Sequence, residues 1–371
     1  MELPTHGQGV ILFRGGNSFS IWNRQKTEYL SVEFTDTEVL VTKNDKVWPM
    51  KSSGGLTRDP AGYMWFSIDS QNVRLRAGIG EARMETMHSE GVSSCAETDK
   101  KWLESLCFVV GEIEILHILR DPIVYATPML VADMRDLSLD MVAEGKYVPN
   151  STLPAAAQQL YACVAGPKFT LDDPSFPEFS AAIQRSILTP GLWCFETLKR
   201  KAGEFGKPNP DETYLRITLG QNSGESPGVP YVMEIWPAGH FSPVHSHSEA
   251  NAVIRVLHGG IHVSLYPFLS AAVKPCAQAD FKEGEITWLN AYMNQTHQLK
   301  NITNDVCVTI QCYMYDASDK RHYDYFDYLD ADGKIQQYEP DSDMGYVDFK
   351  KMMKKEWSEF QLKGKSSCVL C

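Results

Sequence analysis

Residues 1 to 150 contain short runs in which apolar and polar side chains alternate. Leu30, Val32 and Phe34 are each followed by a polar residue, and residues 113–119 show the same alternation less regularly. A period of two buries one face of a strand and leaves the other in water. Because Gly and Pro residues separate these runs, we expect a β-sandwich domain over residues 1–150.

The pattern changes in residues 151–340, where a helical connector precedes a second set of strands. Residues 155–161, 178–188 and 192–205 have the spacing and boundaries of short helices. From residue 214 to residue 315, apolar runs bounded by Gly or Pro return. The pattern therefore predicts a mainly β chain with two domains, the second formed by the connector and these strands.

Apolar residues in the last segment, 341–371, recur at helical spacing and predict a basic amphipathic helix. One interpretation is that its apolar face packs against the second domain. The residues that define the two faces are Phe349, Met352, Met353, Trp357 and Phe360 on one side, and Lys350, Lys351, Lys354 and Lys355 on the other.

The last four residues allow a different interpretation of this segment. Cys368-Val369-Leu370-Cys371 has the form of a prenylation signal with an unusual final residue. Lys363 and Lys365 would supply the basic second signal that stable anchoring requires. A prenylated Cys368 would attach the protein peripherally to a membrane. The same residues spell C-x-x-C, but no βα context supports a redox motif.

Charge and composition exclude several classes of protein. The chain has 35 Lys and Arg residues against 47 Asp and Glu residues, a net charge of -12, which disfavours a protein whose main task is to bind nucleic acid. The most apolar stretch, residues 106–132, is broken by charged residues, so we do not expect it to span a membrane. The N-terminus has no secretory pattern, and the nine cysteines are scattered without framework spacing. We therefore expect a cytoplasmic protein with reduced thiols.

Two closely spaced histidines carry the clearest chemical signal. Residues i and i+2 of a strand point the same way, so His245 and His247 would present two imidazoles to one face. His297, on a later strand, could add a third inside a small β-barrel. Imidazole suits Fe, Zn, Cu and Ni, and three ligands leave coordination positions open for chemistry. A His-x-His pair by itself can also be an accident of the surface.

The spacing around these histidines resembles the two motifs of the cupin family. Gly239, five residues, His245, one residue, His247 and eleven residues to Gly259 match the first motif. The segment from Gly284 through His297 to Asn301 matches much of the second. This resemblance implies a cupin β-barrel with His245, His247 and His297 as metal ligands.

The site also resembles the cysteine dioxygenase branch of that family. Cupins usually place a Glu shortly beyond the second histidine, where this chain has Asn251 and Ala252. A site of three histidines without the acidic ligand is typical of the thiol dioxygenases, and residues 236–247 are similar to their stretch through the first two ligands. Glu249 lies two residues beyond His247, so it would point to the same face and reach a metal only if the strand stays regular.

Three further positions extend this resemblance, which covers roughly residues 176 to 320. Arg216 matches the arginine that binds the carboxylate of cysteine, and Tyr313 falls on the active-site tyrosine. Gln311 stands where that family has a histidine bonded to the tyrosine hydroxyl, and Ala252 stands where animal members have a crosslinking cysteine. Without the resemblance, Arg216 would be a surface charge and Tyr313 a core aromatic residue.

The resemblance implies an Fe(II)-dependent enzyme that oxidises a small, cysteine-like thiol with O2 to a sulfinic acid. In that case Arg216 would bind a carboxylate, and Tyr313 would hydrogen-bond the substrate or the oxygen. The alternative is a metal-binding or sugar-binding cupin without turnover, acting as a sensor or scaffold. Gln311 and the Gly/Ser/Pro-rich insertion at residues 220–228 favour this alternative. We expect His258 and His262 to bind no metal.

Overall fold

The computed structural model divides the chain into two compact units. Unit 1 contains residues 1–127 and 272–276, and unit 2 contains residues 128–271 and 277–371. The residues described are 1–59, 61–93, 96–220, 231–315 and 325–368, with residues 96 and 364–368 described by their backbone alone.

Unit 1 is built from two antiparallel sheets, with strand orders β11-β1-β7-β8-β9-β6 and β10-β2-β3-β4-β5. Leu30, Val32 and Phe34 of β3 are buried, as their alternation predicts. Phe13 of the first sheet packs edge-on against Phe19 of the second, so the two sheets enclose one core. The strands are β1 (Gln8–Arg14), β2 (Ser18–Asn23), β3 (Tyr29–Phe34), β4 (Val39–Lys43), β5 (Lys46–Trp48), β6 (Lys51–Ser52), β7 (Met64–Asp69), β8 (Arg74–Ile79), β9 (Met87–Val92), β10 (Leu106–Val110) and β11 (Glu114–Leu119), with helix α1 (Ala96–Leu103) and the 3-10 turn η1 (Met84–Thr86).

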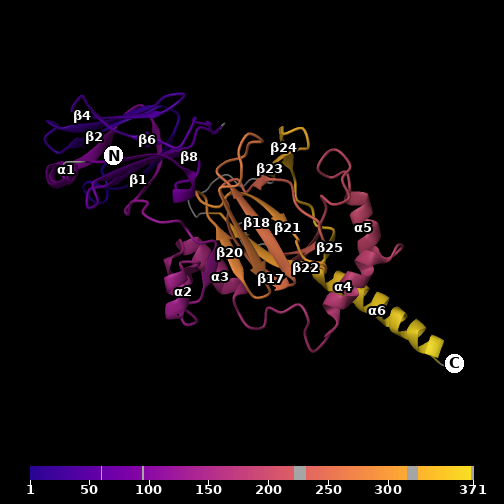
Figure 1. The fold of residues 1–371 in the computed structure, drawn as a ribbon. Coiled ribbons are helices and arrows are strands. Elements are labelled where there is room, and N and C mark those ends of the chain that lie inside the picture. Colours follow the sequence, from indigo (N-terminus) through magenta and orange to yellow (C-terminus); the bar gives the residue numbers. More distant parts are fainter. Residues whose placement is uncertain (60, 94–95, 221–230, 316–324, 369–371) are drawn as a thin grey trace. The chain divides into compact units, whose positions relative to one another are not determined.

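Unit 2 contains an eight-stranded sheet and a six-stranded sheet (Figure 1). Their orders are β13-β12-β20-β17-β22-β15-β14-β25 and β19-β18-β21-β16-β23-β24. The strands are β12 (Leu130–Ala132), β13 (Tyr147–Pro149), β14 (Leu215–Gly220), β15 (Tyr231–Trp236), β16 (His245–Ser246), β17 (Asn251–His258), β18 (Gly260–Tyr266), β19 (Ala277–Lys282), β20 (Ile286–Leu289), β21 (Thr296–Lys300), β22 (Cys307–Met314), β23 (Phe326–Leu329), β24 (Ile335–Tyr338) and β25 (Met344–Gly345).

The units divide at residue 127, whereas the sequence pattern places the domain boundary at residue 150. The difference arises because β12 pairs antiparallel with β20, and β13 pairs with β12, so both strands extend the large sheet of unit 2. Such long-range pairing leaves no local mark in the sequence. The short helix α2 (Leu139–Glu144) and the turn η2 (Asn150–Thr152) therefore also belong to unit 2.

Three helices form the connector before β14, close to their expected ranges. They are α3 (Ala155–Val164), α4 (Phe179–Leu188) and α5 (Trp193–Lys201). Helix α3 packs against Val253 of β17 and Ile310 of β22, and α4 and α5 pack against Leu215 of β14 and Ile235 of β15. The helices thus cover one face of the eight-stranded sheet. The predicted fold class, mainly β with a sandwich, a helical connector and a two-sheet barrel, is confirmed.

The same strands turn alternate residues to the other face of the large sheet. Leu215, Ile235 and Ile310 point to the helices, so Arg216, Glu234 and Gln311, which adjoin them, point into the barrel. Strands β14, β15 and β22 are therefore apolar on the face toward the helices and carry polar groups on the face toward the barrel interior. These inward polar residues build the site described below.

Helix α6 (Tyr346–Cys368) is the amphipathic helix expected in the last segment. Phe349 and Met353 are fully buried, and they join the core formed by α4, α5 and β14. Lys350 Nζ lies 2.6 Å from Asp173 Oδ2. Figure 1 shows α6 running beside α4 toward the C-terminus. The side chain of Cys368 and all of residues 369–371 lie outside the described residues, so the prenylation hypothesis stays a prediction.

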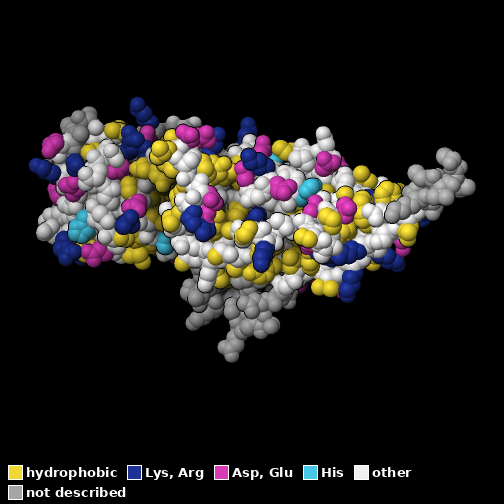
Figure 2. All heavy atoms as spheres, turned by 90° about the horizontal axis from the view of Figure 1, so that it is seen from below, with side chains coloured by type: hydrophobic (Ala, Val, Ile, Leu, Met, Phe, Trp, Pro, Cys, Tyr) yellow, Lys and Arg dark blue, Asp and Glu magenta, His cyan; other side chains and the backbone are white. Residues whose placement is uncertain are grey.

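Charges of both signs are mixed on the face of the molecule shown in Figure 2, where Lys and Arg side chains are interspersed with Asp and Glu side chains. No described helix combines the length and the apolar character needed to cross a membrane. The expected lack of nucleic-acid binding stays a prediction.

Candidate metal centre

His245, His247 and His297 converge in the interior of the barrel. Strand β16 carries His245 directly opposite His297 of β21 in the antiparallel register, and His247 follows just after β16 ends. One ligand nitrogen of each ring lies within 4.8 Å of the others. His247 and His297 are buried. The fold therefore gathers residues that are 50 positions apart in the sequence into one cluster.

The surroundings of the three rings favour neutral imidazoles. Burial lowers the pKa of His245 to about 4 and lowers the pKa of His247 and His297 well below the ordinary value. His245 Nδ1 donates to the carbonyl oxygen of Pro243 at 3.0 Å, and His297 is hydrogen-bonded to the backbone of Asn294. Such hydrogen bonds fix the orientation of a ligand ring and leave its other nitrogen for a metal.

The spacing of the nitrogens fits a bound transition metal. His247 Nε2 and His297 Nε2 lie 3.0 Å apart. Two nitrogens at about 2 Å from one ion, set at roughly 90° to 110°, would be about 3 Å apart. His247 Nδ1, on the other side of the ring, is buried and has no hydrogen-bond partner among the residues that the structure describes. The cluster could thus hold a metal ion, with imidazole donors that suit Fe, Zn, Cu or Ni.

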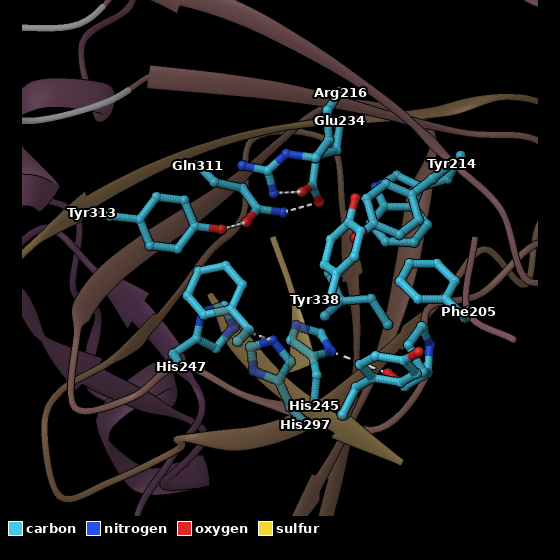
Figure 3. Close-up of a pocket in the computed structure, with 15 residues that line it drawn as sticks. Phe205, Tyr214, Arg216, Glu234, His245, His247, His297, Gln311, Tyr313 and Tyr338 are labelled. Carbon is cyan, nitrogen blue, oxygen red and sulfur yellow. Dashed lines mark hydrogen bonds and ion pairs between the residues drawn. The ribbon is translucent and has the colours of Figure 1, made fainter. Parts of the chain in front are cut away.

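A chain of buried polar side chains faces the histidines across the cavity (Figure 3). Arg216 of β14 pairs with Glu234 of β15, Nη1 to Oε1, at 3.1 Å. Gln311 of β22 donates through Nε2 to the other oxygen of Glu234, and the hydroxyl of Tyr313 donates to Gln311 Oε1. Three neighbouring strands thus form one continuous hydrogen-bonded network.

Burial and pairing act against each other in this network. Burial raises the pKa of Glu234 to about 7, although the Arg216 guanidinium opposes that rise. For Arg216, burial lowers the pKa, but Glu234 and the nearby tyrosines together outweigh burial, so the net pKa is raised. Burial also raises the pKa of Tyr313, so its hydroxyl keeps its proton at neutral pH and remains a donor. Arg216 is therefore charged, and the acidic side chain nearest to it, that of Glu234, belongs to the protein and titrates near neutral pH.

Aromatic side chains close the rest of the cavity. Tyr214 stacks on Trp236 with ring centroids 4.3 Å apart, and Phe205 packs edge-on against Tyr338 at 4.9 Å. Figure 3 shows Tyr214, Phe205 and Tyr338 on the same side of the cavity. The cavity contains about 420 Å³ of space free of protein atoms, including some open solvent. A bound organic molecule must therefore be small.

The structure brings together all six residues that the sequence singled out for the site. His245, His247, His297, Arg216, Gln311 and Tyr313 line one cavity. Ala252 lies opposite Tyr313 in the register of β17 and β22, so the position of the absent crosslinking cysteine adjoins the tyrosine.

Glu249 and the neighbouring histidines His240, His258 and His262 lie outside the cluster. Strand β16 ends at Ser246, and Glu249 has a positive φ of 66° and an exposed side chain, so the regular strand it needed does not continue. His258 lies near Glu283, His262 pairs with Asp280 at 2.6 Å, and His240 bonds Thr213.

Glu234 and the aromatic wall were not predicted. Glu234 is the single charged residue in the apolar run of β15, which was a signal that a strand buries a carboxylate. Its partner could not be read from the sequence, because Arg216 lies 18 positions earlier. Phe326, Tyr328 and Tyr338 of the wall fall beyond the range of the family resemblance.

No protein-family model and no curated protein matches the chain. Similar solved structures include the cupin domain of Cnp3 from Schizosaccharomyces pombe, with 16% identity and a TM-score of 0.23 over 28% of this chain and 65% of that one. A cupin superfamily protein from Desulfitobacterium hafniense shares 11% identity, with a TM-score of 0.22 over 29% of this chain and 81% of that one. An oxalate oxidase bound to glycolate shares 19% identity, with a TM-score of 0.24 over 31% of this chain and 56% of that one.

The match thus spans less than two thirds of the yeast domain and of the oxalate oxidase. Two of these proteins are described as cupins, and none of the three as a thiol dioxygenase. Similarities at this level give no information on activity. Any inference about function therefore rests on the geometry of the cavity.

Proposed function

We propose that the chain is an iron-dependent dioxygenase of small thiols. The observation that carries the proposal is the convergence of three neutral imidazoles, two of them buried and one partly buried, with a network of buried polar groups in one small cavity. Three histidines leave coordination positions open, which catalysis needs and a purely structural metal does not. A cavity walled by aromatic rings excludes bulk water from a reactive site.

In this proposal His245, His247 and His297 hold the metal, and the opposite wall orients the substrate. Bound Fe(II) would supply open positions for a thiolate sulfur and for O2. The overall reaction is R–SH + O2 → R–SO2H, in which sulfur loses four electrons, O2 gains four, and both oxygen atoms form bonds to sulfur. Tyr313 keeps its proton at neutral pH and donates it to Gln311, so a hydrogen bond from Tyr313 to the substrate would require its hydroxyl to turn from Gln311 toward the cavity.

The proposal is tested by metal analysis coupled to oxygen uptake. The full chain is loaded with Fe(II) without oxygen, its iron content is measured, and O2 consumption is followed with cysteine, cysteamine, 3-mercaptopropionate and 1-propanethiol. We expect about one iron per chain and O2 consumption with at least one thiol, with a sulfinic acid as the product.

His297→Ala is expected to reduce the iron content at least tenfold, because one of three ligands is lost. His262→Ala is the matched control, since His262 lies on the neighbouring β18 and pairs with Asp280 outside the cluster. It should retain iron and activity. Iron-loaded protein that consumes no O2 with any of the thiols would contradict the proposal and favour a metal-binding cupin without turnover.

A further inference from the structure

We propose that Glu234 determines the substrate specificity of the cavity by keeping Arg216 from binding a carboxylate, so that the site selects thiols without one. This inference rests on the proposed function and concerns its substrate class. It departs from the role that the family resemblance implies for Arg216. The reasons are the position of Glu234, the lack of another cation in the cavity lining, and the cost of separating the pair.

Glu234 is held against Arg216 by the backbone. The two residues are direct partners in the antiparallel register of β14 and β15, and both side chains are over 90% buried. Gln311 of β22 binds the second oxygen of the carboxylate. Glu234 is thus held by side chains from both neighbouring strands, in contact with the guanidinium of Arg216 at the cavity wall.

The described lining of the cavity contains one cationic side chain apart from the histidines, that of Arg216. Lys201 lies just outside, where its Nζ is 3.0 Å from Asp343 and 3.3 Å from Glu204. A carboxylate entering the cavity would find both cations already paired with acidic side chains of the protein.

A substrate carboxylate near Arg216 would also meet the carboxylate of Glu234. Like charges repel strongly where water is excluded, and breaking the buried pair would leave Glu234 without its partner. A thiol without a carboxylate avoids both penalties. Its sulfur can bind at the histidines while its remaining atoms contact Tyr214, Phe205 and Tyr338, which line the same cavity.

The test measures thiol binding without turnover. The full chain is loaded with Co(II), and thiols are titrated anaerobically while the thiolate-to-cobalt absorption is recorded. Two pairs differ by the carboxylate: cysteine against cysteamine, and 3-mercaptopropionate against 1-propanethiol. We expect the carboxylated member of each pair to bind at least tenfold more weakly.

Glu234→Gln removes the charge and keeps the shape, so Arg216 gains an unpaired positive charge. We expect the affinity ratio in both pairs to shift at least tenfold toward the carboxylated thiol. The double variant Glu234→Gln/Arg216→Gln should lose that shift, and His262→Ala should keep the wild-type ratios.

Two outcomes separate this inference from the proposed function. Wild-type protein that binds cysteine as tightly as cysteamine overturns the role of Glu234 and leaves the proposed function intact, even where the Glu234→Gln variant does not fold. Cobalt that is not bound, or that gives no thiolate absorption with any thiol, overturns the proposed function and the inference together.

Discussion

Glu234 shows how one residue changes what a site can do. A carboxylate in an apolar strand is unfavourable unless a partner compensates its burial, and Arg216 and Gln311 both do so. That compensation also occupies the guanidinium. The same contact that makes the buried acid tolerable thus removes a binding group from the cavity.

Asp59 in unit 1 is a buried acid of a different kind. It is 8% exposed, and it accepts a hydrogen bond from the backbone N–H of Ala61 at 2.8 Å. Burial raises the pKa of Asp59 to about 6 from an ordinary value of 3.8, although backbone hydrogen bonds oppose the rise. Between pH 3.8 and about 6, the Asp59 carboxyl is therefore mostly protonated in the folded chain and mostly ionised in the unfolded chain.

This difference predicts a pH-dependent stability. Because the pKa is higher in the folded state, the contribution of Asp59 to the free energy of unfolding falls as pH rises from about 4 to about 6. Asp59→Asn removes the titration and keeps the acceptor. As pH rises from about 4 to about 6, we expect the free energy of unfolding of the variant to increase by about 1 to 3 kcal/mol relative to that of wild type. Above this range the difference between the two proteins should stay constant.

Urea denaturation of both proteins at several pH values measures that difference. Monitoring the transition of unit 1 makes the comparison specific. A difference that stays the same from pH 4 to pH 8 would show that Asp59 titrates normally.

At the scale of elements, α6 is an amphipathic helix with two unequal halves. Its first turns bury Phe349 and Met353 against α4, α5 and β14. Farther along, Phe360 is 44% exposed and lies beneath the guanidinium of Arg185, 4.5 Å from its ring centroid. The helix is therefore anchored to the barrel by its N-terminal half.

Two phenylalanines of this helix form a matched pair. Phe349→Ala opens a cavity in the core and should lower the free energy of unfolding of unit 2 by about 3 to 5 kcal/mol. Phe360→Ala removes the same atoms from a half-exposed site and should cost less than about 1 kcal/mol. Chemical denaturation of the two variants measures these free energies of unfolding. Equal decreases in the two variants would contradict the conclusion that the N-terminal half anchors the helix.

At the scale of the whole molecule, the candidate metal site belongs to one unit. Among the described residues, all those that line the cavity lie in unit 2, and none comes from residues 1–127 or 272–276. A metal that binds only folded unit 2 stabilises that unit by mass action.

Calorimetry of the full chain should therefore show two transitions, of which metal shifts one. At a free metal concentration about 100 times the Kd, the gain is about 2.7 kcal/mol, or roughly 5 to 10 °C for a unit of this size. The shifted transition should be the one that Phe349→Ala lowers, and His297→Ala should abolish the shift. A metal-induced shift of both transitions by the same amount would argue against a site confined to unit 2.

Local patterns determined much of this protein. Alternation at Leu30, Val32 and Phe34 predicted β3, helical spacing predicted α3 to α6, and the spacing of His245, His247 and His297 predicted one cluster. These features depend on neighbours along the chain or on a family spacing, so the sequence alone displays them.

The tertiary structure decided what depends on partners distant in sequence. Pairing of β12 with β20 moved residues 128–150 into unit 2, and the register of β14 and β15 placed Glu234 against Arg216. The family resemblance implied that Arg216 binds a substrate carboxylate, but the neighbouring strand supplies the carboxylate of Glu234 to it. Register arises from the whole sheet, and for that reason the charge available to a ligand became visible only in the folded barrel.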